Sequence, residues 1–202
     1  MVIAPLAVEP YGAAALVIWC APDQTLGVAE RARARWPQAR EVVPGADSVV
    51  VEGIAEVEQA VIEVAQWSVL ATSGEHDALV ELPTIYDGPD LVEVARHWGV
   101  GPDEAVLIHT APTYRVAFCG FAPGFAYCTG LPADREVPRR ASPRPRVAAG
   151  SVALAGAFTG IYPTPSPGGW QIVGRTTAPL WDLGREEPAL LVPGTRVRFV
   201  AR

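Results

Sequence analysis

Glycine and proline interrupt the chain at short intervals from Tyr114 to its end, and this spacing is the strongest constraint on the fold. Neither residue suits a helix interior, whereas both suit the turns between short strands. The apolar runs between these breaks predict strands at Arg115–Phe121, Ser151–Ala155, Gln171–Val173 and Arg196–Val200. Residues 113–202 are therefore expected to form a β-barrel or sandwich.

The first 82 residues have a different pattern, in which short apolar runs alternate with amphipathic segments. The expected strands are Ala13–Trp19, Arg40–Val43, Ser48–Glu52 and Ala78–Leu82, and the expected helices are Thr25–Trp36 and Ala55–Trp67. Pro44 and Gly45 between the second and third strands are a hairpin signal. The order β-α-β-β-α-β predicts a split ferredoxin-like module over residues 1–82.

Residues 83–112 are expected to form a helical connector between these two modules. Turn residues at 86–90 precede a predicted helix over Leu91–Trp98, and Gly99 to Gly101 break that helix. A second helix is predicted from Pro102 to His109 or Thr110, because proline suits the first helical position. The fold class expected for the whole chain is therefore α+β.

Composition excludes several kinds of chemistry. All 16 basic residues are arginine, so the chain lacks the lysine of a P-loop, a Schiff-base enzyme or a biotinyl carrier. The three cysteines form no close pair, so neither a disulfide framework nor a metal site is expected. We expect no signal peptide and no membrane span, and hence a soluble cytoplasmic protein.

Charge divides unevenly along the chain. Residues 1–112 carry 5 arginines against 17 acidic residues, and residues 113–202 carry 11 arginines against 5 acidic residues. This asymmetry indicates two modules with different neighbours, although an acidic half is also simply well solvated. The net charge of −6 and the lack of an arginine-rich helix argue against nucleic-acid binding.

Three loops in the second module could carry chemistry. Gly120–Tyr127 combines small residues with aromatic ones, Arg135–Arg146 holds five arginines, and Thr159–Trp170 ends in Ser-Pro-Gly-Gly-Trp. Guanidinium groups bind carboxylates and phosphates bidentately, and glycine lets a backbone approach a ligand. The alternatives are a structural turn and a solvated basic loop. The surroundings of Ser166 do not match the Gly-x-Ser-x-Gly pattern of a nucleophile.

These loops, in this order, resemble the family of 5-oxoprolinase B subunits, which includes allophanate hydrolase subunit 1 and the KipI-type inhibitors of a histidine kinase. The matching stretches are Tyr-Asp-Gly-Pro-Asp-Leu at 86–91, His-Thr-Ala-Pro at 109–112, Gly-Phe-Ala-Pro-Gly-Phe at 120–125, Pro-Arg-Arg-Ala-Ser-Pro-Arg at 138–144, Ala-Gly-Ser-Val at 149–152, Thr-Gly-Ile-Tyr-Pro at 159–163, Ser-Pro-Gly-Gly-Trp-Gln-Ile-Val-Gly-Arg-Thr at 166–176 and Pro-Gly-Thr-Arg-Val-Arg-Phe at 193–199. The chain departs from the family pattern at Ala157 and Phe158, where Asn and Gln are expected.

The resemblance implies a cyclophilin-like barrel behind the ferredoxin-like module. It also implies a subunit that is inactive alone and works with a larger C-type subunit, and often with an A-type subunit. Together these subunits use ATP to open the lactam of 5-oxoproline, giving glutamate. The alternatives are a KipI-like kinase inhibitor and a half-site of the carboxyltransferase or allophanate hydrolase type.

The same stretches supply the expected site residues. We expect His109 and Arg144 to act in catalysis, with His109 at the rim of a pocket, and an arginine among 139, 140 and 144 to hold an anionic group. The residues expected to bind substrate or partner are Phe121, Pro123, Gly124, Phe125, Tyr127, Arg139, Arg140, Thr159, Tyr162, Ser166, Pro167, Gly168, Gly169, Trp170 and Arg175.

Overall fold

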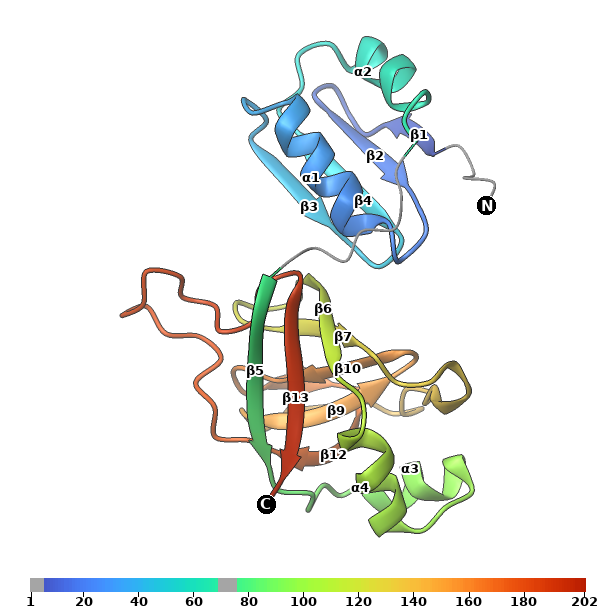
Figure 1. Ribbon diagram of the computed structural model, residues 1–202, viewed down its shortest axis with the longest axis vertical. Helices are drawn as coiled ribbons and strands as arrows, with labels where there is room; N and C mark the ends of the chain where they lie inside the picture. The colour runs from blue at the N-terminus through green and yellow to red at the C-terminus, as the bar shows by residue number, and fades with distance from the viewer. Residues whose placement is uncertain (1–5, 69–75) are drawn as a thin grey trace. The chain divides into compact units, whose positions relative to one another are not determined.

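The computed structural model describes residues 6–68 and 76–202, and the chain forms two compact units, one up to residue 75 and one from His76 to Arg202. Figure 1 shows a helix-covered sheet in the first unit and a strongly curved sheet in the second. Along the described residues, no helix is long and apolar enough to cross a membrane.

The first unit is a four-stranded antiparallel sheet covered by two helices. Its elements are β1 (Ala7–Pro10), β2 (Ala15–Trp19), α1 (Thr25–Arg35), β3 (Glu41–Pro44), β4 (Ser48–Glu52) and α2 (Val57–Val64), with strand order β1-β2-β4-β3. The side chains of Val49 and Val51 are buried, as the two-residue period of a strand requires for one face of β4. Helix α1 packs against β3 and β4, and α2 packs against β1 and β2 (Figure 1).

The predicted ferredoxin-like order is not confirmed, because the strand expected to close this sheet lies elsewhere. Segment Ala78–Leu82 belongs to β5 (His76–Thr84), which pairs in parallel with β13 (Thr195–Ala201) in the second unit. The free edge of β2 is taken instead by β1, which was not predicted as a strand. The local sequence of β5 suits any sheet, and its partner lies more than a hundred residues further along the chain.

The second unit is a barrel-like sheet that fits the expected cyclophilin-like barrel. Its other elements are α3 (Leu91–Trp98), α4 (Pro102–Thr110), β6 (Tyr114–Cys119), β7 (Ala126–Thr129), a 3-10 turn (Ala133–Arg135), β8 (Arg144–Val147), β9 (Ser151–Ala155), β10 (Phe158–Ile161), β11 (Ser166–Gly168) and β12 (Gln171–Arg175). Seven strands follow the order β12-β9-β10-β7-β6-β13-β5. Ile85, just after β5, pairs with Arg175 at the end of β12, which nearly closes the ring.

Helices α3 and α4 belong to this second unit. Val94, Ala95 and Trp98 on α3 and Ala105 on α4 are buried in the same apolar cluster as the barrel interior. The segment expected to connect the modules therefore covers the barrel beside β12 and β13 (Figure 1). Gly99, with a φ of 72°, ends α3 in the left-handed conformation that favours glycine.

Candidate functional site

The three loops singled out in the sequence converge on one small pocket of the second unit. Its volume is about 100 Å³, and its lining comes from the β6–β7 loop, the arginine loop before β8, and the segment around β11. The lining residues are Phe121, Phe125, Tyr127, Arg139, Tyr162, Pro167, Gly168, Gly169 and Trp170. All nine are among the residues expected to bind substrate or partner.

Phe125 is the centre of the pocket wall. Its ring meets those of Phe121, Tyr162 and Trp170 edge to face, with centroids 5.3, 5.3 and 5.5 Å apart. This arrangement is favourable for aromatic quadrupoles. Phe125 is only 2% exposed, so the wall that it forms is part of the apolar core.

Phe121 is the opposite case, because its ring is 62% exposed at the mouth of the pocket. Its φ of 70° is the only positive value at a non-glycine residue among those described. A bulky residue rarely adopts this left-handed conformation, and strain of this kind concentrates at functional sites. The loop therefore presents an aromatic ring to solvent at the cost of backbone strain.

Glycine is required at two positions that shape this pocket. A Cβ at Gly168 would lie 2.2 Å from the hydroxyl oxygen of Tyr162, and one at Gly160 would lie 2.9 Å from the rings of Phe125 and Trp170. At Gly169 the nearest atom would be 3.6 Å away, which is an ordinary contact. Gly168 and Gly160 thus allow the aromatic walls to close against the backbone.

Arg139 supplies the only charge among the described lining residues. It is exposed and makes no ion pair with any described residue. Burial raises the pKa of Tyr127 and that of Tyr162, and the positive charge of Arg139 opposes this increase at both hydroxyls. The pocket therefore presents two protonated phenols and a guanidinium group that has no carboxylate partner in the described part of the chain.

Arg140 and Arg144 are held by a carboxylate of the chain itself. Arg140 Nη1 and Arg144 Nη2 donate to Oδ1 of Asp90, at 2.9 and 2.7 Å, and the Ile172 amide donates to Oδ2 at 2.7 Å. The side chain of Asp90 is 5% exposed. Of the three arginines expected to hold an anionic group, only Arg139 therefore lacks a carboxylate partner among the described residues, and the catalytic role expected of Arg144 has no support in this geometry.

Asp90 organises the arginine loop, and the sequence analysis did not select it. It joins the arginine loop to β12, and the Arg140 amide donates to the Gly169 carbonyl at 2.8 Å. The acidic residue was visible in the Tyr-Asp-Gly-Pro-Asp stretch. Its partners lie 50 or more residues away, so spacing alone could not identify them.

His109 does not stand at the rim of this pocket, contrary to expectation. It is 2% exposed, and its ring packs against Phe199 and Tyr114 with centroids 4.7 and 5.3 Å away. Nδ1 lies 2.7 Å from the Tyr86 hydroxyl, and Nε2 lies 3.3 Å from Oγ1 of Thr159. Burial lowers the pKa of His109 to about 3, so the imidazole is neutral at physiological pH. It is a core residue of the barrel.

The other expected site residues lie around the pocket without lining it. Thr159 is fully buried beside His109, Gly124 packs against Leu180 and Trp181, and Pro123 is exposed in the loop. Oγ of Ser166 is buried and has no hydrogen-bond partner among the described residues, so nothing activates it as a nucleophile. Arg175 Nε donates to Asp87 at 2.8 Å, in a separate groove.

The departure from the family pattern at Phe158 falls behind the pocket. The Phe158 ring meets those of Phe118 and Tyr127 edge to face, with centroids 5.6 and 5.8 Å apart. Phe158 thereby extends the aromatic cluster beyond the residues that line the pocket. Neither Ala157 nor Phe158 lines the cavity. The absence of Asn and Gln side chains at these two positions therefore removes no hydrogen-bond donor or acceptor from the pocket wall.

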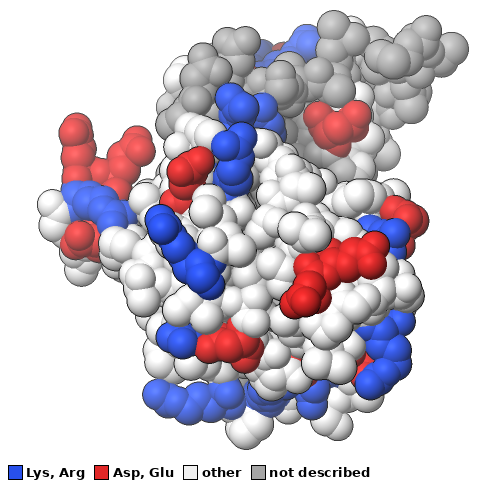
Figure 2. Space-filling view, turned by 60° about the horizontal axis from the view of Figure 1, so that its bottom comes forward, with Lys and Arg blue, Asp and Glu red and all other residues white. Residues whose placement is uncertain are grey.

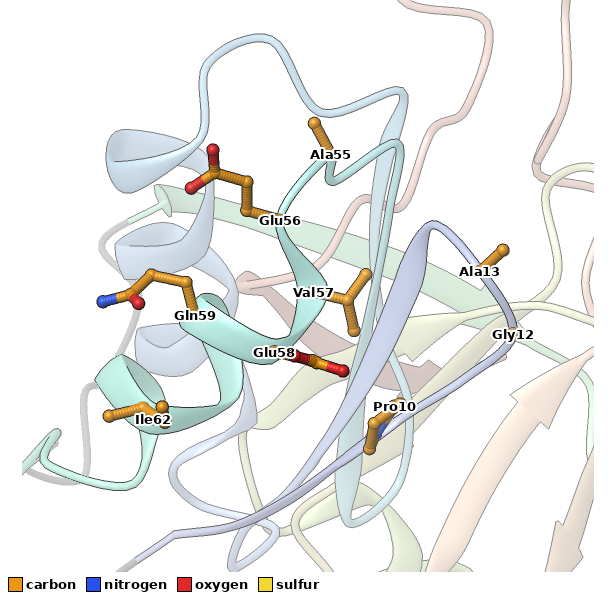
Figure 3. A pocket seen from close by; sticks show the side chains of 9 residues that line it. All are labelled: Pro10, Gly12, Ala13, Ala55, Glu56, Val57, Glu58, Gln59 and Ile62. Atoms are coloured by element: carbon orange, nitrogen blue, oxygen red, sulfur yellow. The ribbon is translucent and has the colours of Figure 1, made fainter.

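The first unit holds a larger cavity, but the three loops expected to carry chemistry do not meet there. This cavity of about 620 Å³ lies between the β1–β2 turn and the start of α2, where Ile62 and the carboxylates of Glu56 and Glu58 form part of the lining. Figure 3 shows the Glu56 and Glu58 side chains pointing in opposite directions, so they form no acid–base pair. We therefore place the candidate site in the second unit.

The chemistry of the aromatic pocket is that of a binding site. Its lining offers apolar ring faces, two phenols and one guanidinium, which suit a small anion with a flat body. No carboxylate, imidazole or thiol lies among the described residues that line it. No group of three His, Cys, Asp or Glu side chains that could hold a metal occurs in the described ranges 6–68 and 76–202.

Comparisons with known proteins find matches along most of this chain. The family model described as carboxyltransferase domain, subdomain C and D, matches residues 6–191. The 5-oxoprolinase B subunit of Escherichia coli O157:H7 is 40% identical over 173 residues, which are 81% of this chain and 78% of that protein. The 5-oxoprolinase B subunit of Bacillus subtilis (strain 168) is 45% identical over 125 residues, or 60% and 52% of the two chains.

Solved structures add the fold and a difference in length. TTHA0988 is 32% identical with a TM-score of 0.78, and the match covers 94% of this chain but only 40% of TTHA0988. The conserved uncharacterized protein PH0987 from Pyrococcus horikoshii is 30% identical with a TM-score of 0.60, over 96% and 97% of the two chains. The urea amidolyase of K. lactis, at 15% identity and a TM-score of 0.77, shares the fold.

Proposed function

We propose, from the premise that this chain belongs to the family of 5-oxoprolinase B subunits, that it is a subunit of an ATP-dependent 5-oxoprolinase-type hydrolase. In that reaction water adds across the lactam amide of 5-oxoproline, the C–N bond breaks, and glutamate forms with a new carboxylate and a free amine. Hydrolysis of ATP to ADP and phosphate drives the opening of the ring.

The observation that carries this proposal is a pocket equipped to bind but not to catalyse. Arg139 would donate hydrogen bonds to the substrate carboxylate, and Phe121 and Trp170 would cover the faces of the flat lactam ring. The hydroxyls of Tyr127 and Tyr162 are protonated donors that suit a lactam carbonyl oxygen. A base and a nucleophile must then come from elsewhere in an assembly.

We therefore propose a composite site shared with a larger C-type subunit, with an A-type subunit as a further partner. Each curated relative is named as one lettered subunit of an enzyme, which supports an assembly. The length of TTHA0988 supports an assembly as well. This chain covers only 40% of that protein, and a larger partner subunit would account for the difference in length. The exposed ring of Phe121 is the type of residue that is enriched at interfaces.

The test is an assay of ATP-dependent glutamate formation from 5-oxoproline with the co-purified subunits. The complete set is expected to be active, and omission of this chain is expected to abolish activity. This chain alone is expected to be inactive. The Glu58→Gln variant of the first unit is the control and should behave as the unmodified chain.

Two results would overturn the proposal. One is that the purified subunits, mixed at micromolar concentration, elute as separate species on size exclusion. The other is hydrolysis that does not depend on this chain. Inhibition of a histidine kinase by this chain alone, without a C-type partner, would instead favour the KipI-like alternative.

A further inference from the structure

A second hollow of the barrel unit, distinct from the aromatic pocket, is lined by three arginines. This groove of about 390 Å³ lies where β8 and the end of β12 meet the turn before α3. Arg144, Arg146 and Arg175 line it, and Asp87 is the only acidic residue among its described lining. Figure 2 shows basic and acidic side chains intermingled over much of the visible surface, with basic ones in an interrupted row along the lower margin.

Two of these arginines come from the same strand. Arg144 and Arg146 both lie in β8, and both line the groove. Arg146 is exposed and makes no ion pair or hydrogen bond with any described residue. Two guanidinium groups thus reach one groove from a single rigid element.

Unsatisfied donor capacity remains in this groove. Nη2 of Arg144 donates to Asp90, whereas Nη1 is shielded from solvent and has no acceptor among the described residues. A buried donor without an acceptor costs free energy. Arg175 donates only Nε to Asp87, an exposed pair that water already competes for.

The floor of the groove is backbone brought unusually close. A Cβ at Gly88 would lie 2.3 Å from the carbonyl oxygen of Ile172, and one at Gly174 would lie 2.5 Å from that of Ile85. Both glycines line the groove. Glycine at these two positions therefore lets the turn before α3 pack directly against the backbone of β12.

We propose that this groove binds a phosphate-bearing anion with at least two phosphoryl groups, such as inorganic pyrophosphate or the polyphosphate of a nucleotide. Three guanidinium forks offer more donors than one carboxylate can accept, whereas a diphosphate presents oxygens to all of them. A nucleic acid is disfavoured, because the chain carries a net charge of −6.

The groove and the aromatic pocket share one ion-pair network. Arg144 lines the groove, Arg139 lines the pocket, and Asp90 ties Arg144 to Arg140, the neighbour of Arg139. An anion in the groove would therefore be linked to the pocket through this network. If the proposed function holds, this is where the phosphoryl groups of ATP would bind, although groove binding does not depend on that function.

Binding is tested on the full chain alone by isothermal titration with pyrophosphate, ATP and adenosine at fixed ionic strength. Pyrophosphate should bind and adenosine should not. Arg146→Gln and Arg175→Gln should each weaken pyrophosphate binding by about ten-fold or more, the loss expected for a charge-assisted hydrogen bond. Asp87→Asn should tighten binding, because it removes the competing carboxylate from Arg175. The matched control Arg198→Gln, which changes an exposed arginine of β13, should bind as the unmodified chain does.

The outcomes separate the possible ligands. Binding of both pyrophosphate and ATP supports a nucleotide polyphosphate, and binding of pyrophosphate alone supports an inorganic one. No binding of either, or equal affinity in Arg146→Gln, Arg175→Gln and Arg198→Gln, would overturn the proposal. The titration contains no hydrolysis step, so it tests the groove alone. If the groove binds these anions but the assembled subunits do not hydrolyse 5-oxoproline, the proposed function is refuted and the groove proposal stands.

Discussion

Phe121 and Phe125 are four residues apart in one loop, yet they have opposite roles. Phe125 is buried at the centre of the pocket wall, whereas Phe121 is 62% exposed at its mouth and carries backbone strain. Phe121 is therefore the residue whose removal tests ligand binding without disturbing the core.

We predict that Phe121→Ala reduces activity of the assembled complex about ten-fold or more, because a ring that covers substrate contributes about 1.5–3 kcal/mol of apolar burial. Its free energy of unfolding should stay within about 0.5 kcal/mol of the unmodified chain. Phe125→Ala should lose about 3–5 kcal/mol of stability. Urea unfolding and the glutamate assay measure the two effects. Full activity in Phe121→Ala would show that this ring does not touch substrate.

His109 makes stability depend on pH. Burial lowers its pKa in the folded state from 6.5 to about 3, so the unfolded chain binds its proton more readily. The stabilisation is complete above about pH 6.5 and is lost as pH falls toward 3. We predict a loss of about 1 kcal/mol per pH unit in this window, measured by urea unfolding at a series of pH values.

The matched variants for this effect are His109→Gln and His97→Gln. His97 is exposed on α3, and among the described residues its ring bonds only the Glu136 carbonyl oxygen. His97→Gln should keep the pH slope, whereas His109→Gln should start less stable and lose the part of the slope that is due to His109. An unchanged slope in a folded His109→Gln chain would contradict the burial argument.

At the scale of elements, the turn before α3 holds two aspartates that differ in burial and in hydrogen-bond partners. Asp90 is buried and ties the arginine loop to β12, whereas Asp87 is half exposed and, within the described part of the chain, pairs only with Arg175. They are three residues apart, so they form a matched pair for the cost of removing a carboxylate.

We predict that Asp90→Ala destabilises the chain by about 3 kcal/mol, because it leaves two guanidinium groups and the Ile172 amide without their acceptor. Asp87→Ala should cost less than about 1 kcal/mol, as an exposed pair does. Thermal and urea unfolding measure both. Equal losses in the two variants would mean that the buried network does not hold these elements together.

At the scale of the whole molecule, the structure places β5 with the barrel and not with the sheet that precedes it. Its parallel pairing with β13 runs from Leu79 opposite Arg196 to Thr84 opposite Ala201, and Leu82 is fully buried. Without β5, β13 would be an open edge and part of the barrel core would be exposed.

We predict that a fragment of residues 76–202 folds, whereas a fragment of residues 83–202 does not. The first should show a cooperative thermal transition by circular dichroism, because it retains the complete barrel-like sheet with α3 and α4. Cooperative unfolding of the shorter fragment would place β5 outside the stable core.

Local sequence was enough to predict most elements of the fold. The helices at 91–98 and from Pro102, the hairpin around Pro44 and Gly45, and the β-rich second module follow from caps, turns and spacing. The glycine, arginine and aromatic content of the loops that line the pocket singled them out, but a structural turn and a solvated loop stayed open, and the individual site residues were expected from the resemblance.

Tertiary structure alone decided three matters. β5 joined the second sheet because its partner strand comes from the end of the chain. His109 became a neutral core residue because rings from other elements exclude water around it. Arg144 found an internal carboxylate in Asp90, whereas Arg139 found none among the described residues. Strand pairing, burial and ion pairing each depend on groups distant in sequence, so no local pattern could determine them, whereas a turn or a helix cap depends on its immediate neighbours and can be predicted from them.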